Sequence, residues 1–414
     1  MSEWKKVKLG ELYEVHNGLS KGRQFFGTGF PFLTFSNVFN NWFLPDQLES
    51  LVQTTDKERE ACSIKAGDVF ITRTSETMDE LGMSSVALKD YPNATYNGFT
   101  KRLRPITNRV NPRYIGYYLR TPKFRGQFMA FSSMTTRASL ANNDLLNMEV
   151  ELPSMEIQHR IATILSRYDS LIESHLKQIK LLEEAAQRLY KEWFIDLHFP
   201  GHENTKIVDG VPEGWEKKKL CELFSFVRGK SYTSKELSDE GTIMVNLKNI
   251  QSFGGYKSDV EKHFIGTYKE EQTLMKGDLI MGITDMTQER RLVGSVALIP
   301  DFKETATFSM DLIKLISFKL PNIYLYCAMR YGDVSRQIAP LANGVNVLHL
   351  KPEAISNIEM VVASDSIIEK FVSYTSKTIE SILSLQSQLR LLTEARDRLL
   401  PKMMSGEIKI ESLN

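Results

Sequence analysis

Apolar residues recur every three or four positions along two long stretches of the chain. In the first stretch the residues that share this stripe are Ile157, Ile161, Ile164, Tyr168, Leu171, His175, Ile179, Leu182, Ala186, Leu189 and Trp193. In the second they are Ile367, Phe371, Tyr374, Ile382, Leu385, Leu389, Leu392 and Leu399. This spacing is typical of a coiled-coil helix. We therefore expect two helices, each on the order of 50–60 Å long, and we expect the second to end at Pro401 because proline cannot continue a helix.

The rest of the chain has shorter patterns. Runs rich in β-forming residues at 68–72, 85–88, 278–281 and 295–299 are bounded by Gly, Asp and Pro, which predicts strands between turns. Helical patterns follow at 112–119 and 322–330. Both regions are therefore expected to mix strands and short helices.

The chain also contains an internal repeat. A shift of about 210 residues superposes its two halves in order. WKKVKLGEL at 4–12 returns as WEKKKLCEL at 215–223, and KAGD at 65–68 returns as MKGD at 275–278. SVAL at 85–88 is repeated at 295–298, and the Glu184 to Leu189 pattern returns at Glu394 to Leu399.

The repeat predicts an α+β protein with two mixed α/β domains separated by two long antiparallel coiled-coil helices, related by a pseudo-twofold. The expected parts are a first domain at 1–155, a central helix at 156–198, a linker at 199–211, a second domain at 212–364, and a C-terminal helix and tail at 365–414. Each long helix must bury its apolar stripe, and the other helix is the expected partner. A coiled coil between two copies of the chain is the alternative.

Composition narrows the class of protein. Of 414 residues, 42% are hydrophobic and 25% charged, which is ordinary for a globular protein. The N-terminus has no signal-peptide pattern, and no apolar run approaches the roughly 20 residues of a membrane span. Three distant cysteines fit reduced, buried thiols. These features predict a cytoplasmic protein with no membrane association.

The net charge of +1 does not by itself indicate nucleic-acid binding. However, the segment 101–137 contains nine Lys or Arg residues and no Asp or Glu. Such a segment can neutralise DNA phosphates. The alternative is a solvated surface whose acidic partners come from elsewhere in the fold.

Four motifs in order resemble the specificity subunit of type I restriction–modification systems over essentially the whole chain. They are LPSMEIQHRI at 152–161, LEEAAQRLYKEWF at 182–194, VPEGWEKKKL at 211–220 and LLPKMMSGEI at 399–408. The second long helix opens with SDSIIE at 364–369 and lacks the Pro and Gln of the first copy, so its start is less well defined.

The resemblance implies a non-catalytic subunit in which two target-recognition domains each read one half of a split, asymmetric site in double-stranded DNA. It implies that the paired helices set the distance between half-sites and dock two methyltransferase subunits. Those partners methylate adenine at N6 with S-adenosylmethionine, and added motor–nuclease subunits cleave DNA with ATP and Mg²⁺. The chain itself is expected to hold no cofactor.

Base readout requires side chains that form paired hydrogen bonds with base edges, such as Arg with guanine and Asn or Gln with adenine. Together with two arginines of the basic segment, such residues in predicted loops are the candidate DNA contacts: Lys21, Arg23, Arg73, Arg102, Arg104, Arg137, Arg228, Lys230, Gln288, Arg290, Arg291, Asn343 and Asn346. For each, a plain surface role is the alternative. Arg73 and the pair Arg290 and Arg291 are favoured because they follow equivalent Gly-Asp strands.

For several aromatic and charged residues a structural role is an alternative to a functional one. Tyr114, Tyr117, Tyr118, Phe124 and Phe128 could stack on bases, but their helical spacing favours the core. The i,i+4 pairs Glu184–Arg188 and Glu394–Arg398 are either ion pairs within a helix or part of a docking surface, and the sequence leaves both open.

Enzymatic motifs are weak. FFGTG at 25–29 matches an S-adenosylmethionine-loop pattern but does not follow an apolar strand, and the chain has neither the adenine-methyltransferase tetrapeptide nor a P-loop. The histidines do not have metal-ligand spacing. The alternatives to a specificity subunit are a coiled-coil protein scaffold and another sequence-specific DNA-binding regulator.

Overall fold

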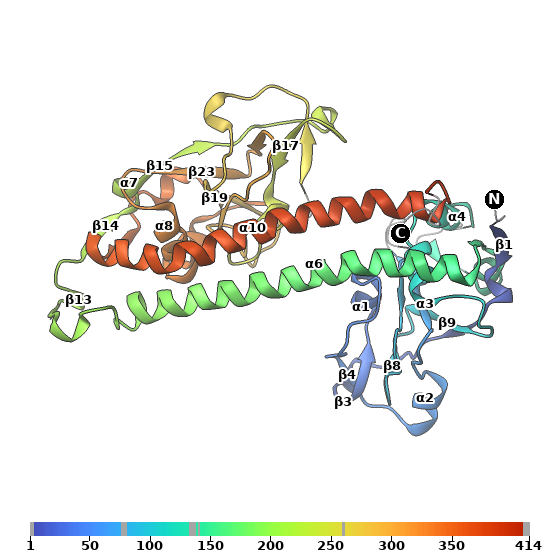
Figure 1. Ribbon diagram of the computed structural model, residues 1–414. Helices are drawn as coiled ribbons and strands as arrows, with labels where there is room; N and C mark the ends of the chain where they lie inside the picture. Colours follow the sequence, from blue (N-terminus) through green and yellow to red (C-terminus); the bar gives the residue numbers. More distant parts are fainter. Residues whose placement is uncertain (1–3, 76–80, 132–137, 140, 259–260, 409–414) are drawn as a thin grey trace. The chain divides into compact units, whose positions relative to one another are not determined.

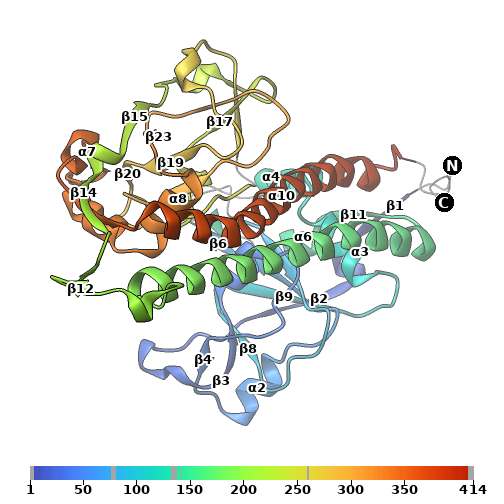
Figure 2. The same ribbon diagram turned by 60° about the vertical axis from the view of Figure 1, so that its left-hand side comes forward.

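The computed structural model describes residues 4–75, 81–131, 138–139, 141–258 and 261–408 (Figures 1 and 2). It divides into two compact units. Unit 1 comprises Met1–Ser170 and Ala395–Asn414, and unit 2 comprises Leu171–Glu394. The division falls inside both long helices, so each unit contains one end of each helix.

The strands of unit 1 form four sheets. A four-stranded antiparallel sheet has the order β2-β9-β5-β7, and a three-stranded sheet has the order β4-β3-β8, in which β3 and β8 are parallel. Two-stranded ribbons join β1 to β11 and β6 to β10. The strands are β1 (Lys5–Lys8), β2 (Tyr13–Asn17), β3 (Phe26–Leu33), β4 (Leu51–Val52), β5 (Val69–Thr72), β6 (Thr74–Ser75), β7 (Ser84–Val86), β8 (Thr95–Tyr96), β9 (Thr100–Pro105), β10 (Ala138–Ser139) and β11 (Glu149–Leu152).

Unit 2 repeats this topology. Its sheets have the orders β15-β23-β19-β21 and β16-β18-β17-β22, the second with a parallel β17–β22 pair, and its ribbons join β14 to β25 and β20 to β24. A separate hairpin joins β12 to β13. The strands are β12 (Ile207–Val208), β13 (Val211–Pro212), β14 (Glu216–Lys219), β15 (Phe224–Arg228), β16 (Leu237–Ser238), β17 (Thr242–Val245), β18 (Lys262–Phe264), β19 (Leu279–Gly282), β20 (Thr284–Asp285), β21 (Val296–Leu298), β22 (Ala306–Phe308), β23 (Leu312–Ser317), β24 (Leu348–His349) and β25 (Glu359–Val362).

The repeat extends to single backbone atoms. A Cβ atom on Gly18 would lie 2.0 Å from the carbonyl oxygen of Asn97, and one on Gly229 would lie 2.0 Å from that of Ser309. Since real Cβ atoms do not approach so closely, both positions require glycine. The two units therefore share local stereochemistry as well as strand order.

Short helices connect the strands. Unit 1 contains α1 (Phe35–Asn40), α2 (Asp56–Ala61), α3 (Pro112–Tyr118), α4 (Pro122–Phe131) and α5 (Asn142–Asn147). Unit 2 contains α7 (Leu220–Leu223), α8 (Asn322–Tyr331) and α9 (Val334–Ile338). The helical patterns at 112–119 and 322–330 thus become α3 and α8. The prediction that five aromatic residues belong to the core is confirmed, because all of them are fully buried in unit 1. They are Tyr114, Tyr117, Tyr118, Phe124 and Phe128.

The long helices are α6 (Met155–Tyr190), which ends in a π-helical turn at Lys191–Ile195, and α10 (Asp365–Met404). In unit 2 they run antiparallel, because His175 contacts Gln388 while Tyr190 contacts Phe371 further along. In unit 1, Ile161 and Leu165 of α6 share a core with Leu400 and Met403 of α10 and with apolar residues of the β2-β9-β5-β7 sheet. One end of α6 and one end of α10 therefore contribute to the core of each unit.

Three details of the helices differ from the prediction. α10 continues through Pro401 to Met404, because Pro401 still accepts a hydrogen bond from the amide of Ser405 and lies in the last turn. Leu171 and Tyr374 were placed on the buried stripes but are exposed. Cys62 and Cys327 are buried as expected, whereas Cys221 is exposed. No helix in the described part of the chain is both long and apolar enough to cross a membrane.

Candidate nucleic-acid interface

A preorganised loop follows the β20–β24 ribbon of unit 2. Asp285 at the end of β20 is buried, and its carboxylate accepts hydrogen bonds from the amide and hydroxyl of Thr287 and from the amide of Leu292. An acceptor with three donors fixes the path of the intervening residues. The loop 286–292 is thus held at both ends by one side chain.

This loop and the turn before β24 contain five of the predicted contacts. Gln288 donates through its amide nitrogen to the carbonyl of Val345, at 2.7 Å, which joins loop 286–292 to the turn that holds Asn343 and Asn346. Arg290 has a left-handed φ of 54°, and Arg291 forms an exposed ion pair with Glu289 at 2.6 Å. Five polar side chains able to read base edges are therefore gathered at one ribbon.

The equivalent ribbon of unit 1 joins β6 to β10, and Arg73 immediately precedes it. The amide of Arg73 donates to the carbonyl of Phe99, whose ring is 60% exposed. Lys101 lies nearby, and its pKa is lowered by burial and then by the charge of Arg73. The amide of Ile283 donates in the same way to Asp311, so the counterpart of Arg73 is Ile283 rather than Arg290. Arg137 lies outside the described residues.

Arg102 and Arg104 point into unit 1, which contradicts their prediction as DNA contacts. Arg102 is 2% exposed and donates to the carbonyl of Ser63 at 2.7 Å. Lys314, at the equivalent position of β23, donates to the carbonyl of Thr273 at 2.7 Å. Arg104 forms two hydrogen bonds with buried Asp68, which raise its pKa. These cations stabilise the sheet.

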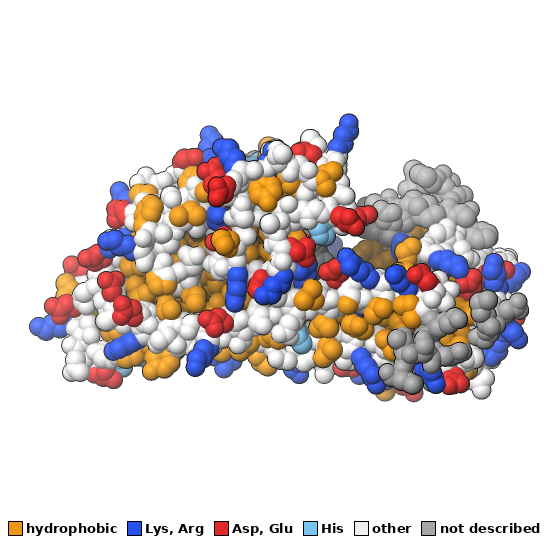
Figure 3. Space-filling model, turned by 45° about the horizontal axis from the view of Figure 1, so that its top comes forward, with side chains coloured by type: hydrophobic (Ala, Val, Ile, Leu, Met, Phe, Trp, Pro, Cys, Tyr) orange, Lys and Arg blue, Asp and Glu red, His pale blue; other side chains and the backbone are white. Residues whose placement is uncertain are grey.

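Most other members of the basic segment 101–137 that the structure describes also have structural partners. Arg120 donates to the carbonyls of Ser84, Val38, Phe39 and Asn41, and burial lowers the pKa of Arg120 to about 10. Lys123 pairs with Glu151 at 2.6 Å. On the face in Figure 3, basic and acidic side chains are intermingled. The segment therefore fits the alternative of partners from elsewhere in the fold.

The remaining candidates lie at the ends of β2 and β15. Lys21 pairs with Glu58 and lowers the pKa of that carboxyl, while Arg23 is exposed. Arg228 pairs with Glu353 at 2.7 Å and likewise lowers the pKa of its partner. Lys230 lines a cavity of about 330 Å³ together with Lys269. Two of these four residues, Lys21 and Arg228, are thus paired with carboxylates of their own unit.

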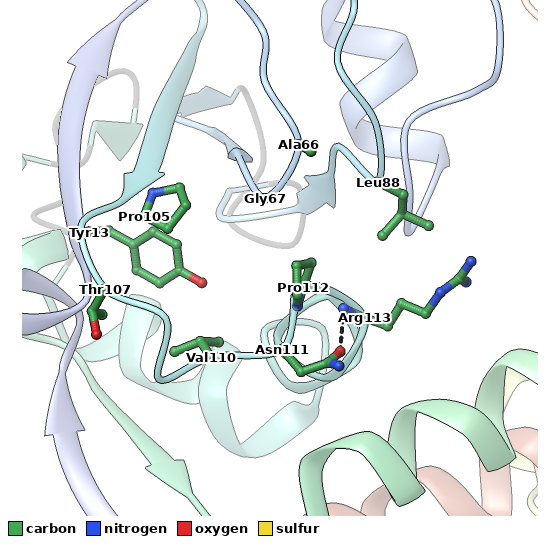
Figure 4. A pocket seen from close by; sticks show the side chains of 10 residues that line it. All are labelled: Tyr13, Ala66, Gly67, Leu88, Pro105, Thr107, Val110, Asn111, Pro112 and Arg113. Atoms are coloured by element: carbon green, nitrogen blue, oxygen red, sulfur yellow. Dashed lines mark hydrogen bonds between the residues drawn. The ribbon is translucent and has the colours of Figure 1, made fainter. Parts of the chain in front are cut away.

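A cavity of about 440 Å³ in unit 1 is lined mainly by apolar side chains (Figure 4). Its polar members are few: Asn111 accepts a hydrogen bond from the amide of Arg113, and the guanidinium of Arg113 extends away from the cavity. The lining offers no pair of a nucleophile and a base. FFGTG at 25–29 likewise runs into strand β3 instead of forming a loop after a strand.

Comparisons with known proteins agree with this architecture. Residues 1–184 match the family described as the type I restriction modification DNA specificity domain. The chain is 26% identical to the type I restriction enzyme MjaIX specificity subunit of Methanocaldococcus jannaschii, covering 99% of this chain and 95% of that protein. It is 22% identical to the type I restriction enzyme HindI specificity subunit of Haemophilus influenzae, covering 99% and 100%.

A solved structure shares the fold over nearly the whole length. The S subunit of a type I restriction–modification system from M. genitalium matches with a TM-score of 0.58 and 15% identity, covering 97% of this chain and 96% of that one. The chain is thus similar to type I restriction–modification specificity subunits along nearly its whole length.

Three residues at the candidate interface were not among the predicted contacts. Asp285 organises loop 286–292, Phe99 lies exposed beside Arg73, and Phe253 lies exposed beside Arg291. The Asp-x-Thr pattern at 285–287 is typical of a side-chain turn and could have indicated Asp285. The two phenylalanines have no comparable signal, because their exposure depends on contacts far along the chain.

Proposed function

We propose that the two units read the two halves of a bipartite, asymmetric DNA site. In this proposal residues 1–155 and 212–364 are the target-recognition domains, joined through the linker at 199–211. The helices at 156–198 and 365–414 act as the spacer between them. Two weak half-site contacts on one chain give a tight specific complex through effective concentration.

The observation that carries the proposal is the repeated ribbon with different side chains. Unit 1 has Arg73 before β6–β10, whereas unit 2 has Gln288, Arg290 and Arg291 beside β20–β24. Arginine suits guanine, and glutamine or asparagine suits adenine. Different donor and acceptor sets in equivalent places are what two unlike half-sites require.

We further propose that the long helices dock two methyltransferase subunits. Three leucines of α6 within unit 2 are about half exposed, namely Leu171, Leu176 and Leu181. A docked partner protein would cover these exposed apolar side chains. S-adenosylmethionine would then be held by the methyltransferase subunits, and ATP and Mg²⁺ by motor–nuclease subunits of the full complex.

The test is modified-base sequencing of DNA from cells that express this chain with its methyltransferase subunit, compared with cells that lack this chain. We expect a new bipartite motif that carries N6-methyladenine in each half. The same experiment reveals the recognised sequence and its spacer.

Unchanged methylation, with the methyltransferase subunit shown to be present and folded, would contradict the proposal for that pair and favour a protein scaffold. A salt titration of DNA binding distinguishes the two roles independently. Phosphate contacts make affinity fall steeply as the salt concentration rises.

A further inference from the structure

Phe253 combines exposure with backbone strain. Its side chain is 70% exposed, and its φ of 66° lies in the left-handed region, which bulky residues rarely adopt. A conformation of this kind is unfavourable and persists where the surrounding structure imposes it. An exposed aromatic ring gains nothing from burial that would offset this cost.

The turn around Phe253 is held rigidly. The amide of Phe253 donates to the carbonyl of Arg291 at 3.0 Å, and the amide of Gly255 donates to Val296 at 2.8 Å. Gly254 and Gly255 leave room for Arg330, since a Cβ on either would lie 2.9 Å from that side chain. The ring is therefore presented by a fixed backbone rather than carried on a loose loop.

Arg330 is itself fixed in place. Its guanidinium forms two hydrogen bonds, of 2.8 and 3.0 Å, with the carboxylate of Glu183 on α6. Gln386 of α10 donates to the carbonyl of Tyr256 at 3.3 Å. The turn 251–256 is thus anchored to both long helices within unit 2.

Unit 1 treats the equivalent position differently. The amide of Leu44 donates to Val86 as that of Gly255 donates to Val296, which makes Trp42 the counterpart of Phe253. The ring of Trp42 packs on Tyr117, with a centroid distance of 5.7 Å, and is half-buried. Unit 2 thus presents outward the aromatic group that unit 1 packs inward.

The surroundings of Phe253 suit a polyanion. The carbonyl that holds its amide belongs to Arg291, and Arg290 beside it also has a left-handed φ. Among the residues that the structure describes, the Nε atom of Arg290 has no hydrogen-bond partner. Proteins use an exposed ring next to a segment that contains arginines to place an apolar group against nucleobases while cations contact the backbone.

We propose that Phe253 is a DNA wedge of unit 2, whose ring stacks on or inserts between the bases of the second half-site. This inference rests on the proposed function and adds to it a contact and a deformation confined to one half of the site. The strain at Phe253 is retained because it aims the ring.

The experiment uses the complex of this chain with its methyltransferase subunits on duplexes that contain the motif found by sequencing. 2-Aminopurine replaces a base in the first or the second half-site and brightens when it is unstacked. For Phe253→Ala we expect binding about 10- to 100-fold weaker and loss of the fluorescence increase in the second half-site alone. Phe253→Trp should retain both.

Two variants separate this role from folding. Phe253→Gly relieves the left-handed strain, so it should be at least as stable as the unaltered chain while losing the same binding. Phe318→Ala removes another exposed ring of unit 2, 56% exposed, and should change neither readout.

Equal affinity and fluorescence for Phe253→Ala and the unaltered chain would overturn the wedge and leave the proposed function intact. Weakened assembly with the methyltransferase subunits in the absence of DNA would also overturn it, because the ring would then contact a protein. If the unaltered chain directs no motif, the proposed function fails and the wedge fails with it.

Discussion

Lys101 and Arg73 hold two positive charges close together inside unit 1. Lys101 is 3% exposed and donates to the side chain of Asn142. Burial and the charge of Arg73 both lower the pKa of Lys101, and among the described residues the Nε atom of Arg73 has no partner. Like charges in a buried place cost stability. An anion bound beside them would offset this cost.

We predict that Lys101→Met stabilises the free chain. Because the folded state lowers the pKa of Lys101, the unfolded chain holds more protons in the window between that lowered pKa and the ordinary value near 10.4. The stability of the unaltered chain should therefore rise with pH across this window, and the advantage of the variant should shrink. Urea unfolding at neutral and alkaline pH measures both.

Lys57→Met is the matched control, since Lys57 is an exposed residue of α2. It should change neither stability nor its pH dependence. The prediction would be contradicted if Lys101→Met destabilised the chain at neutral pH and this effect did not vary with pH. The charge of Lys101 would then stabilise the folded state.

Single residues differ in how far the sequence determines their role. The aromatic residues of α3 and α4 were placed in the core correctly, because helical spacing alone determines which side they share. The prediction for Arg102 and Arg104 was wrong because their partners, Ser63 and Asp68, lie in the segment before β5, more than 30 residues away. The sequence shows that a side chain is charged, but it does not show which distant group that side chain will bond.

The long helices were predictable as elements, but their exposed residues were not. A stripe with a spacing of three and four predicts a helix and one buried face. Leu171 lies on that stripe and is exposed, while Glu183 lies off it and is largely buried against α8. A helix that packs on a second helix and on a domain buries two faces, and the second face depends on tertiary contacts that periodicity does not contain.

We predict that Glu183→Gln destabilises unit 2 strongly. The Glu183–Arg330 pair has side chains 15% and 10% exposed, and it joins α6 to α8 through two hydrogen bonds. Removing one charge leaves the guanidinium buried and uncompensated, which costs about 3–5 kcal/mol. The midpoint of urea unfolding should fall accordingly.

Its neighbour provides the control. Glu184 pairs with Arg188 within the same helix at 4.0 Å, and both side chains are exposed to solvent. Glu184→Gln should therefore cost less than about 1 kcal/mol. Similar losses for the two variants would show that the buried pair contributes no more than a surface pair.

At the scale of the whole molecule, the repeat was the most reliable inference. Equivalent turns with KAGD and MKGD lead to equivalent strands β5 and β19, and glycines 18 and 229 meet equivalent carbonyls. Each of these features depends on a short local sequence, and that sequence occurs in both halves of the chain. The ribbon loops differ between the units in length and side chains, so the repeat predicts where recognition takes place but not which bases are read.

Because the two units have separate cores, contacts made by one should not depend on the other. We predict that Arg73→Ala alters sequence preference in one half of the motif alone, and Arg290→Ala in the other half alone. Each should weaken binding by about 1–3 kcal/mol if it reads a base. In the double variant the two free energies should add within about 0.5 kcal/mol, as for distant sites.

Fluorescence anisotropy with the assembled methyltransferase complex gives the binding energies, and modified-base sequencing gives the half that changes. Arg113→Ala is a suitable control, since Arg113 is exposed in unit 1 and stacks near Phe43, away from the ribbon. A change in both halves from either single variant, or a double variant far from additive, would mean that the units do not read DNA independently. Additive effects confined to opposite halves would instead assign each ribbon to its own half-site, because a shared contact or a rearranged spacer would couple them.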